Sequence, residues 1–344
     1  MAASAWFFRW KEIAIMKRVL VIGVGSIGER HLRCFQMTGR AEVSICEKNE
    51  TLRSTVAANY DVRHAYANLD AGLSDPHDAV VICTPAQLHI PLAQQCAEAN
   101  LHLLIEKPLA IRPDGVDKLR QIVSQRGLAC AVAYVTRMHP ALSAMKRAID
   151  AGRFGPPVQF VACGGQHFPK YRPAYREIYY ADHAQGGGAI QDALTHTLNA
   201  GQWLVGNIDR VAADAAHQVL EGVSVEDTAH VLARHGRVIG SYTLNQYQAA
   251  NESTITVICQ GATVRYEGHH VRWRWLVEPD GDWEGEVFPK LAQDDLFVAQ
   301  ANHFLDVIEG REPPHCSLDE GLATLKAVMA IQRAVTTGRW ESVQ

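Results

Sequence analysis

The glycine-rich segment Gly23-Val24-Gly25-Ser26-Ile27-Gly28 constrains the fold of this chain more than any other feature. An apolar stretch at residues 17–22 precedes the segment, helical periodicity follows it, and Glu47 comes nineteen residues after its last glycine. A G-x-G-x-x-G segment between a strand and a helix, with an acidic residue at this distance, is the fingerprint of a dinucleotide-binding βαβ unit. The sequence therefore predicts a dinucleotide site at this turn, and a glycine-rich turn without a ligand is the alternative.

Each glycine has its own physical role in such a unit. Gly23 permits a tight turn out of the strand, Gly25 lets backbone amides approach the pyrophosphate, and Gly28 lets the following helix pack closely on the sheet. The N-terminus of that helix presents unpaired N–H groups and a partial positive charge to the phosphates. We therefore expect Ser26 and Ile27 to belong to the cofactor site as well.

Glu47 lies where its carboxylate can accept hydrogen bonds from the adenosine ribose hydroxyls. A 2′-phosphate would meet a like charge there, at a cost of about 1 kcal/mol if well solvated and about 4 kcal/mol at an effective dielectric constant near 20. These energies favour NAD(H) over NADP(H) by roughly five-fold to a thousand-fold. The neighbouring Lys48 would offset part of that repulsion, so NADP is the less favoured alternative.

Length, charge and cysteine usage exclude several classes of protein. The 344 residues are enough for two domains. The net charge of −4 gives no basic surface for nucleic acid, and no apolar run reaches the roughly 18 residues of a membrane span. The eight cysteines contain no Cys-x-x-Cys pair, so we interpret them as buried thiols in the reducing cytoplasm, with disulfides as the alternative. Residues 1–15 are too short and too interrupted by charges for a signal peptide, and we expect an extension without an assigned role.

The first half of the chain alternates apolar stretches of strand length with helical periodicity. The stretches lie at residues 18–22, 43–46, 79–83, 101–105 and 128–133. Because strands covered on both faces are almost wholly apolar, residues 16–150 are predicted to form an NAD-binding Rossmann domain with a doubly wound parallel sheet. Ligands bind such sheets beyond the carboxyl ends of the strands, where the Gly23 loop, Thr84-Pro85 and Glu106-Lys107-Pro108 would meet.

The second half has a different pattern. Alternating strands at residues 228–233 and 237–246, and at 254–259 and 263–267, flank glycine-containing turns and predict antiparallel hairpins. We therefore expect residues 151–344 to form an α+β substrate-binding and dimerisation domain with a large, mainly antiparallel sheet, closed by helices near 292–309 and 318–336. One face of that sheet would be less thoroughly covered, which predicts a homodimer or homotetramer through it.

A helix is predicted over residues 189–205, directly after Gly186-Gly187-Gly188. Asp192 and His196 lie one turn apart on its polar side. An aspartate beside an imidazole can fix its tautomer and stabilise its cationic form, as a general base acting on an alcohol requires. An ordinary solvated helix face with an i,i+4 polar pair is the alternative.

Taken together, these motifs resemble the Gfo/Idh/MocA oxidoreductase family over about residues 17–338. The resemblance is carried by the Gly23 loop, Thr84-Pro85 with His89 four residues on, Glu106-Lys107-Pro108, Gly186-Gly187-Gly188 followed by Asp192 and His196, and the closing Gly310-Arg311-Glu312-Pro313. The resemblance implies an NAD(P)-dependent dehydrogenase or reductase of sugars, sugar derivatives or cyclitols.

The resemblance also implies a catalytic set of Lys107, Asp192 and His196. Lys107 would hydrogen-bond the reacting oxygen, aimed by a cis peptide bond to Pro108 that is frequent in the family. His196 would exchange the hydroxyl proton, and Asp192 would orient and charge-balance His196. Whether His196 or Lys107 is the main proton carrier stays open at this point.

Other positions implied by the resemblance are Thr84, Pro85 and His89 along the dinucleotide and Glu106 near the nicotinamide ribose, with strand-end capping or a solvated loop as the alternative. The chain departs from the family pattern at Val135, where an asparagine is common, and at Asn199, where an acidic residue is frequent.

Residues 167–176 hold the best clue to the substrate. This segment combines aromatic rings with cationic donors, which suits a sugar that carries an anionic group or a phosphate, and we expect Arg172, Tyr175 and Arg176 to join the substrate-binding residues Lys107, Asp192 and His196. A basic loop that only packs on a partner subunit is the alternative. His269-His270 lacks further ligands at a suitable spacing, so we expect no metal site.

The sequence thus predicts an NAD(H)-dependent oxidoreductase that acts on a secondary alcohol or ketone of a sugar-like substrate. Three alternatives stay open: a redox-neutral glycoside hydrolase that retains NAD, a reductase of a C=N or C=C bond, and a non-catalytic dinucleotide sensor. The presence of Lys107, Asp192 and His196 argues against the sensor, which needs no proton-transfer residues.

Overall fold

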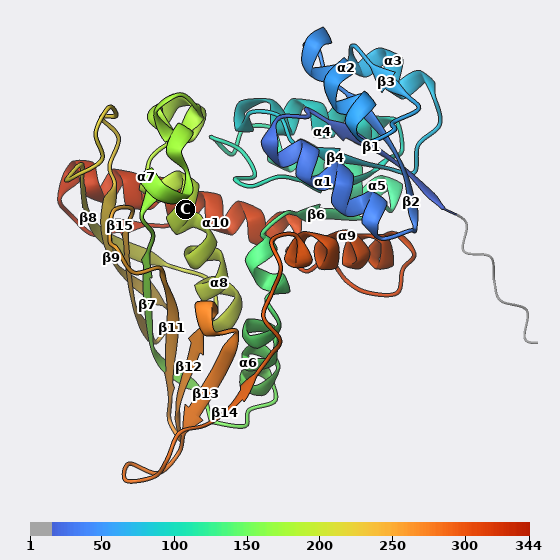
Figure 1. Cartoon of the computed structure of the whole chain (residues 1–344). Coiled ribbons are helices and arrows are strands. Elements are labelled where there is room, and N and C mark those ends of the chain that lie inside the picture. Colours follow the sequence, from blue (N-terminus) through green and yellow to red (C-terminus); the bar gives the residue numbers. More distant parts are fainter. Residues whose placement is uncertain (1–15) are drawn as a thin grey trace, which may run out of the picture.

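A computed structural model describes residues 16–344, which form two β-sheets and the helices that cover and connect them (Figure 1). The extension predicted at residues 1–15 lies outside the described residues. The first sheet is parallel and the second is mainly antiparallel, so the predicted α/β fold class is confirmed.

The parallel sheet has six strands in the order β3-β2-β1-β4-β5-β6. Their bounds are β1 Lys17–Ile22, β2 Ala41–Cys46, β3 Ala65–Tyr66, β4 Ala79–Ile82, β5 His102–Ile105 and β6 Cys130–Val132. Strand order reverses between β1 and β4, so the crevice at the carboxyl ends of these strands is where a doubly wound sheet binds its ligand. The short β3 was not predicted, because neither of its two residues is buried and the segment has no apolar pattern.

Helices cover both faces of this sheet. Val19 and Val21 of β1 pack on one face with α1 (Ser26–Met37) and α2 (Glu50–Asn59), whereas Leu20 and Ile22 pack on the other face. That second face is covered by α3 (Leu69–Ser74), α4 (His89–Glu98) and α5 (Val116–Arg126). Burial on both faces explains why these strands are almost wholly apolar.

The second sheet has nine strands in the order β14-β13-β12-β11-β7-β10-β9-β8-β15. Both predicted hairpins are present, and β7 and β10 form its parallel pair. The bounds are β7 Pro157–Gly165, β8 Arg210–Ala216, β9 Thr228–His235, β10 Val238–Asn245, β11 Glu252–Cys259, β12 Thr263–Glu267, β13 Arg272–Leu276, β14 Glu284–Val287 and β15 Glu341–Ser342.

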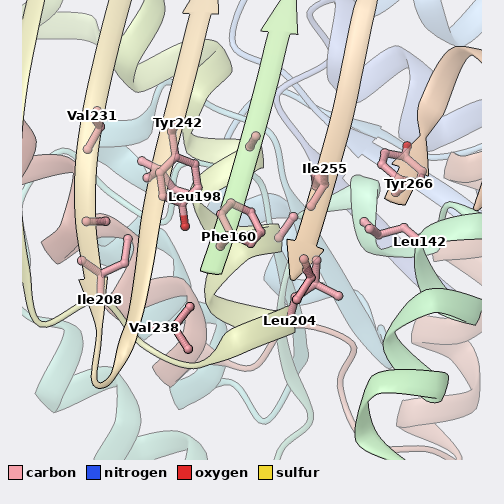
Figure 2. Close-up of a cluster of buried hydrophobic side chains, with 14 of the residues drawn as sticks. Leu142, Phe160, Leu198, Leu204, Ile208, Val231, Val238, Tyr242, Ile255 and Tyr266 are labelled. Atoms are coloured by element: carbon pink, nitrogen blue, oxygen red, sulfur yellow. The ribbon is translucent and has the colours of Figure 1, made fainter. Parts of the chain in front are cut away.

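One face of the nine-stranded sheet packs against α6 (Pro140–Asp150) and α8 (Thr195–Val205). Figure 2 shows the centre of this core, where Phe160 of β7, Leu198 of α8 and Tyr242 of β10 meet. The opposite face leaves apolar side chains such as Leu232 and Ile239 about half exposed. The predicted difference in coverage between the two faces is therefore present.

The last two helices connect the sheets. α9 (Asp295–Ile308) packs on α1, and its Phe304 lies in a core of the parallel sheet. α10 (Leu318–Thr337) packs on β8 and α8, and its Leu322 lies in the other core of the parallel sheet. A boundary near residue 150 therefore separates the two sheets but not the two cores, because apolar faces of α9 and α10 complete the first core.

The eight cysteines are all free in residues 16–344, and seven of them are buried. Over the same residues, no helix combines the length and the apolar character that crossing a membrane requires.

Candidate active site

The glycine loop follows β1 and opens α1, as predicted. Gly23 has a left-handed φ of +82°, which favours glycine. A Cβ on Gly28 would lie 1.9 Å from the carbonyl oxygen of Gly23, so close packing of α1 on the turn requires glycine there. A Cβ on Gly25 would have no neighbour within 4 Å in the described part of the chain, which leaves space beside the N-terminus of α1. The loop is thus a cradle that suits a pyrophosphate.

Glu47 directly follows β2, beside this loop. Its Oε2 accepts a hydrogen bond from the backbone N–H of Val24 at 3.2 Å, and its Oε1 accepts one from Asn49 at 2.9 Å. These contacts hold the carboxylate next to the glycine loop, where a ribose would lie in a dinucleotide complex. Lys48 is exposed and stands one residue further along.

Thr84-Pro85 and His89 follow β4, but His89 points into the protein. The ring lies between two carbonyl oxygens, with Nε2 2.7 Å from Thr84 O and Nδ1 3.0 Å from Pro108 O. Burial lowers the pKa of His89. His89 therefore braces two loops at the edge of the crevice, and contact with the dinucleotide stays a prediction for Thr84 and Pro85. Within residues 16–344, the buried Oγ1 of Thr84 has no hydrogen-bond partner, and a ligand could supply one.

Glu106 is also an internal brace in this structure. Its Oε1 lies 2.7 Å from Nε2 of His31 on α1, and its Oε2 accepts a hydrogen bond from the N–H of Lys107 at 2.9 Å. Burial raises the pKa of Glu106, but His31 and Lys107 together outweigh that effect, so the pKa lies below its usual value. This buried pair ties α1, and with it the glycine loop, to the loop that carries Lys107.

Lys107 and Asp192 form a partly buried ion pair. The Nζ atom of Lys107 donates to the backbone oxygen of Asp192 at 3.0 Å and to its Oδ1 at 3.1 Å. Burial lowers the pKa of Lys107, but the neighbouring Asp192, Tyr179 and Glu106 together outweigh that effect, so the pKa lies above its usual value. Burial alone would raise the pKa of Asp192, but Lys107 and Arg172 hold it well below its usual range. The Lys107–Pro108 peptide bond is cis, as the resemblance implied.

His196 stands apart from this ion pair. Its Nδ1 lies 3.4 Å from the hydroxyl oxygen of Thr136, and its ring meets Tyr134 edge to face at 5.9 Å between centroids. Burial, followed by the charge of Lys107, lowers the pKa of His196 to about 3. The imidazole is therefore neutral at physiological pH.

Asp192, which was expected to orient and charge-balance His196, makes no hydrogen bond to it among residues 16–344. The predicted continuous α-helix is instead a π-helical turn at Ile190–Leu194 followed by α8. Since His196 is neutral, the ammonium of Lys107 stabilises the carboxylate of Asp192 more strongly than the imidazole would. Thr136, and not Asp192, contacts the ring nitrogen of His196.

Two side chains from the segment that precedes the glycine triplet, residues 168–185, contact Asp192. The hydroxyl of Tyr179 donates to Oδ1 of Asp192 at 2.6 Å, and the guanidinium of Arg172 lies 4.0 Å from Oδ2. The side chain of Arg172 is half exposed, whereas that of Asp192 is 3% exposed. Arg172 is thus a cation at the edge of the site with a free side toward solvent.

Tyr175 and Arg176 were expected to bind substrate, but both side chains turn away from Asp192. Tyr175 is buried, and its hydroxyl donates to Glu221 O at 2.8 Å. Arg176 donates to the same carbonyl oxygen at 2.8 Å and pairs with the Glu221 carboxylate. The reason is that Tyr175 packs with Phe168 in a small separate core, which fixes the direction of its neighbour Arg176.

Asn199 and Arg137 lie under the site and do not line it. Both are buried, and Nε of Arg137 donates to Oδ1 of Asn199 at 2.7 Å. Arg137 also donates a hydrogen bond to Glu320 of α10. Asn199, where the chain departs from the family pattern, therefore takes part in contacts between helices.

The residues that the sequence analysis missed are His31, Thr136 and Tyr179. His31 follows Gly28 by three residues in α1, so its place on the buried face of that helix was a usable signal. Thr136 and Tyr179 lie in short irregular turns, where no periodicity shows which way a side chain points. Among residues 16–344, no group of three or more His, Cys, Asp or Glu side chains is arranged to hold a metal ion.

Comparisons with known protein families agree with this geometry. Residues 17–134 match a family described as an oxidoreductase family with an NAD-binding Rossmann fold, and residues 142–265 match the GFO/IDH/MocA C-terminal domain. The chain is 24% identical to a UDP-N-acetylglucosamine 3-dehydrogenase of Acidithiobacillus ferrooxidans, over 93% of this chain and 98% of that protein. It is 23% identical to a myo-inositol 2-dehydrogenase of Thermotoga maritima, over 94% of this chain and 97% of that protein.

Solved structures share the whole fold. A levoglucosan dehydrogenase in complex with NADH and levoglucosan superposes with a TM-score of 0.86 at 20% identity, over 95% of this chain and 99% of that one. The WlbA dehydrogenase of Bordetella pertussis, in complex with NADH and UDP-GlcNAcA, superposes with a TM-score of 0.77 at 24% identity, over 96% and 99%.

Proposed function

Because this chain belongs to the Gfo/Idh/MocA oxidoreductase family, we propose that it transfers hydride between NAD(H) and a secondary alcohol or ketone of a sugar, sugar derivative or cyclitol. The observation that carries the proposal is the Lys107–Asp192 ion pair, whose charges also act on the neutral His196, in a chain whose glycine loop suits a dinucleotide. The dehydrogenases that resemble the chain over nearly their full length act on sugar nucleotides and cyclitols, which supports this substrate class.

The cofactor would be held by three parts of the chain. The N–H groups at the start of α1 would receive the pyrophosphate, Glu47 would accept hydrogen bonds from the adenosine ribose, and Thr84 would contribute its unpartnered hydroxyl. When bound, NAD supplies the hydride acceptor. The carboxylate of Glu47 favours NAD(H) over NADP(H), because it would repel a 2′-phosphate.

The protonation states divide the proton chemistry between Lys107 and His196. Lys107 stays cationic, and Asp192 engages two of its three N–H donors, so one donor is left for the substrate oxygen. That contact would stabilise alkoxide character as the hydride leaves the carbinol carbon. His196 is neutral, and in the tautomer whose Nδ1–H donates to the hydroxyl oxygen of Thr136, its unprotonated Nε2 would take the hydroxyl proton. Of the two candidates for the main proton carrier, we therefore propose His196.

Arg172 supports a substrate with an anionic group. Its guanidinium is half exposed and stands 4.0 Å from the carboxylate of Asp192, which already accepts hydrogen bonds from Lys107 and Tyr179. A carboxylate or phosphate on the substrate could pair with the free side of the guanidinium in bidentate geometry. Binding of such a group would also reduce the cationic charge that lowers the pKa of His196.

The open face of the nine-stranded sheet supports assembly into a homodimer or homotetramer. Leu232 and Ile239 lie half exposed on neighbouring strands of that face, and a second copy of the chain would cover them. The eight free cysteines support a reducing compartment, and we place the protein in the cytoplasm.

The experiment that tests the function follows NADH absorbance at 340 nm with a panel of neutral sugars, uronates, cyclitols and sugar nucleotides. We expect NADH formation with one class for the wild-type protein. The Lys107→Met variant should lose at least about a hundred-fold in kcat, since it removes a donor to a developing oxyanion, and should still bind NADH. Unchanged turnover by Lys107→Met would refute the site. Retained NAD without net reduction, together with glycoside cleavage, would favour the redox-neutral hydrolase.

A further inference from the structure

We propose that Tyr179 is a positioning residue of this site, whose phenol fixes the carboxylate of Asp192 and through it the ammonium of Lys107. The inference deepens the proposed function and rests on it. Tyr179 was not among the residues implied by the family resemblance. It begins a 3₁₀ turn, Tyr179–Ala181, that belongs to neither sheet. This turn lies in the connection between β7 and α8 (Figure 1).

The contacts place Tyr179 and Lys107 on the same oxygen atom. Oδ1 of Asp192 accepts the hydroxyl of Tyr179 at 2.6 Å and Nζ of Lys107 at 3.1 Å. The carboxylate is almost fully buried, so few other donors can reach it. A carboxylate oxygen held by two donors from different segments has little freedom to rotate, and its cationic partner is held with it.

The segment around Tyr179 is built to aim this side chain. Its neighbour Tyr180 is 1% exposed and packs with Phe168 and Tyr175 in a small core, whereas Tyr179 is 39% exposed. The carbonyl oxygen of Tyr180 accepts the N–H of Gly188 at 3.1 Å. A Cβ on Gly187 would lie 2.6 Å from the carbonyl oxygen of Tyr179. Glycine at this position therefore lets the backbone of Tyr179 pack directly on the chain that leads into the π-helical turn with Asp192. Tyr180 thus anchors the segment and Tyr179 points at Asp192.

The hydroxyl of Tyr179 also opposes a competing cation. Arg172 lies 4.0 Å from the other carboxylate oxygen, Oδ2, and its side chain is half exposed. Without the phenol, rotation of the carboxylate toward Arg172 would draw it away from Lys107. Burial, together with the neighbouring charge of Asp192, raises the pKa of Tyr179 to about 12, so the phenol keeps its proton and stays a donor.

The first test compares Tyr179→Phe with Tyr60→Phe. Tyr60 is a matched control, because its hydroxyl donates at the same 2.6 Å to the carboxylate of Glu29, which lies in α1 and does not belong to the Lys107–Asp192 pair. For Tyr179→Phe we expect kcat to fall about ten-fold to a hundred-fold, the loss of one hydrogen bond to a charged group. KM and NADH affinity should stay close to wild type, whereas the unfolding temperature should fall by a few degrees because a partly buried hydrogen bond to a charged group is lost. Tyr60→Phe should leave kcat, KM and NADH affinity unchanged. An unchanged kcat, or a rise in KM alone, would overturn the proposal.

A double-mutant cycle with Asp192→Ala tests whether Tyr179 acts through Asp192. In that background, Tyr179→Phe should lower kcat no further, whereas an equal additional loss would show an independent role and overturn the proposal. If Asp192→Ala does not fold, Asp192→Asn takes its place in the cycle. In the Asp192→Asn background, Tyr179→Phe should then lower kcat by a smaller factor than it does in the wild-type background.

The same cycle measured by denaturant unfolding separates this proposal from the proposed function. Non-additive free energies of unfolding would show that Tyr179 and Asp192 are coupled, and additive values would overturn the contact. If the wild-type protein oxidises nothing in the panel, the proposed function fails, and the unfolding cycle still decides the contact. If it oxidises a substrate and both cycles are additive, the function stands and the role of Tyr179 fails.

Discussion

Alanine at Gly28 and alanine at Gly25 should have different consequences, although both glycines belong to the same fingerprint. In Gly28→Ala the new Cβ would lie 1.9 Å from the carbonyl oxygen of Gly23, a distance that real Cβ atoms essentially never show. That carbonyl cannot yield easily, because Gly23 has a left-handed φ and its N–H donates to Cys46 O at 2.8 Å. In Gly25→Ala the new Cβ meets nothing within 4 Å, and the φ of −60° suits alanine.

The magnitudes follow from these contacts. Overpacking at Gly28 should cost about 1–3 kcal/mol, which lowers the unfolding temperature by several degrees at about 2–4 °C per kcal/mol. The displaced turn should also weaken NADH binding at least about ten-fold. Gly25→Ala should unfold within about 1 °C of wild type, since no protein contact changes. Its Cβ would stand between the backbone and the pyrophosphate, and the loss of one charge-assisted hydrogen bond would raise the Kd of NADH by about ten-fold to a hundred-fold.

The assay is calorimetric unfolding of the nucleotide-free protein combined with titration of NADH fluorescence. Gly28→Ala should change both readouts, and Gly25→Ala should change only the second. If Gly25→Ala binds NADH as tightly as wild type, the close approach of the pyrophosphate to this backbone is refuted. If Gly28→Ala unfolds at the wild-type temperature, the packing argument for Gly28 is refuted.

Two further predictions concern charge in the site. NMR titration of the free protein, assigned with a His196→Gln variant, should show His196 neutral from about pH 5 upward, because its pKa is lowered to about 3 and protonation begins only as the pH falls toward that value. Titration near the ordinary pKa of 6.5 would contradict the burial and charge argument. Arg172→Gln should raise KM for acidic sugars about ten-fold and leave KM for neutral sugars unchanged, whereas the matched Arg176→Gln should change neither, because Arg176 pairs with Glu221. Equal Michaelis constants for Arg172→Gln and wild type across both classes of sugar would remove the anionic-substrate hypothesis.

The sequence predicted those parts of the fold that depend on local patterns. The parallel strands were found because residues buried on both faces form continuous apolar stretches, and the hairpins because half-covered strands alternate. The short β3, with no buried residue, carried no such signal. The packing of α9 on α1 could not be predicted from the sequence either. The sequence of an amphipathic helix shows that the helix has an apolar face, but not which core that face will join.

Within the site, the sequence by itself determined the glycine loop, the acidic residue after β2 and the presence of Lys107, Asp192 and His196. Only the tertiary structure decided how their side chains pair. Helical spacing placed Asp192 next to His196, four residues away, but its carboxylate bonds to Lys107, 85 residues away, and to Tyr179, 13 residues away. The tertiary structure likewise decided that Arg172 lies beside Asp192, whereas Arg176 pairs with Glu221. The physical reason is that a buried carboxylate forms hydrogen bonds with the charged or strong donors that lie nearest in space. The fold sets the distances between the carboxylate and these donors independently of their separation in the sequence.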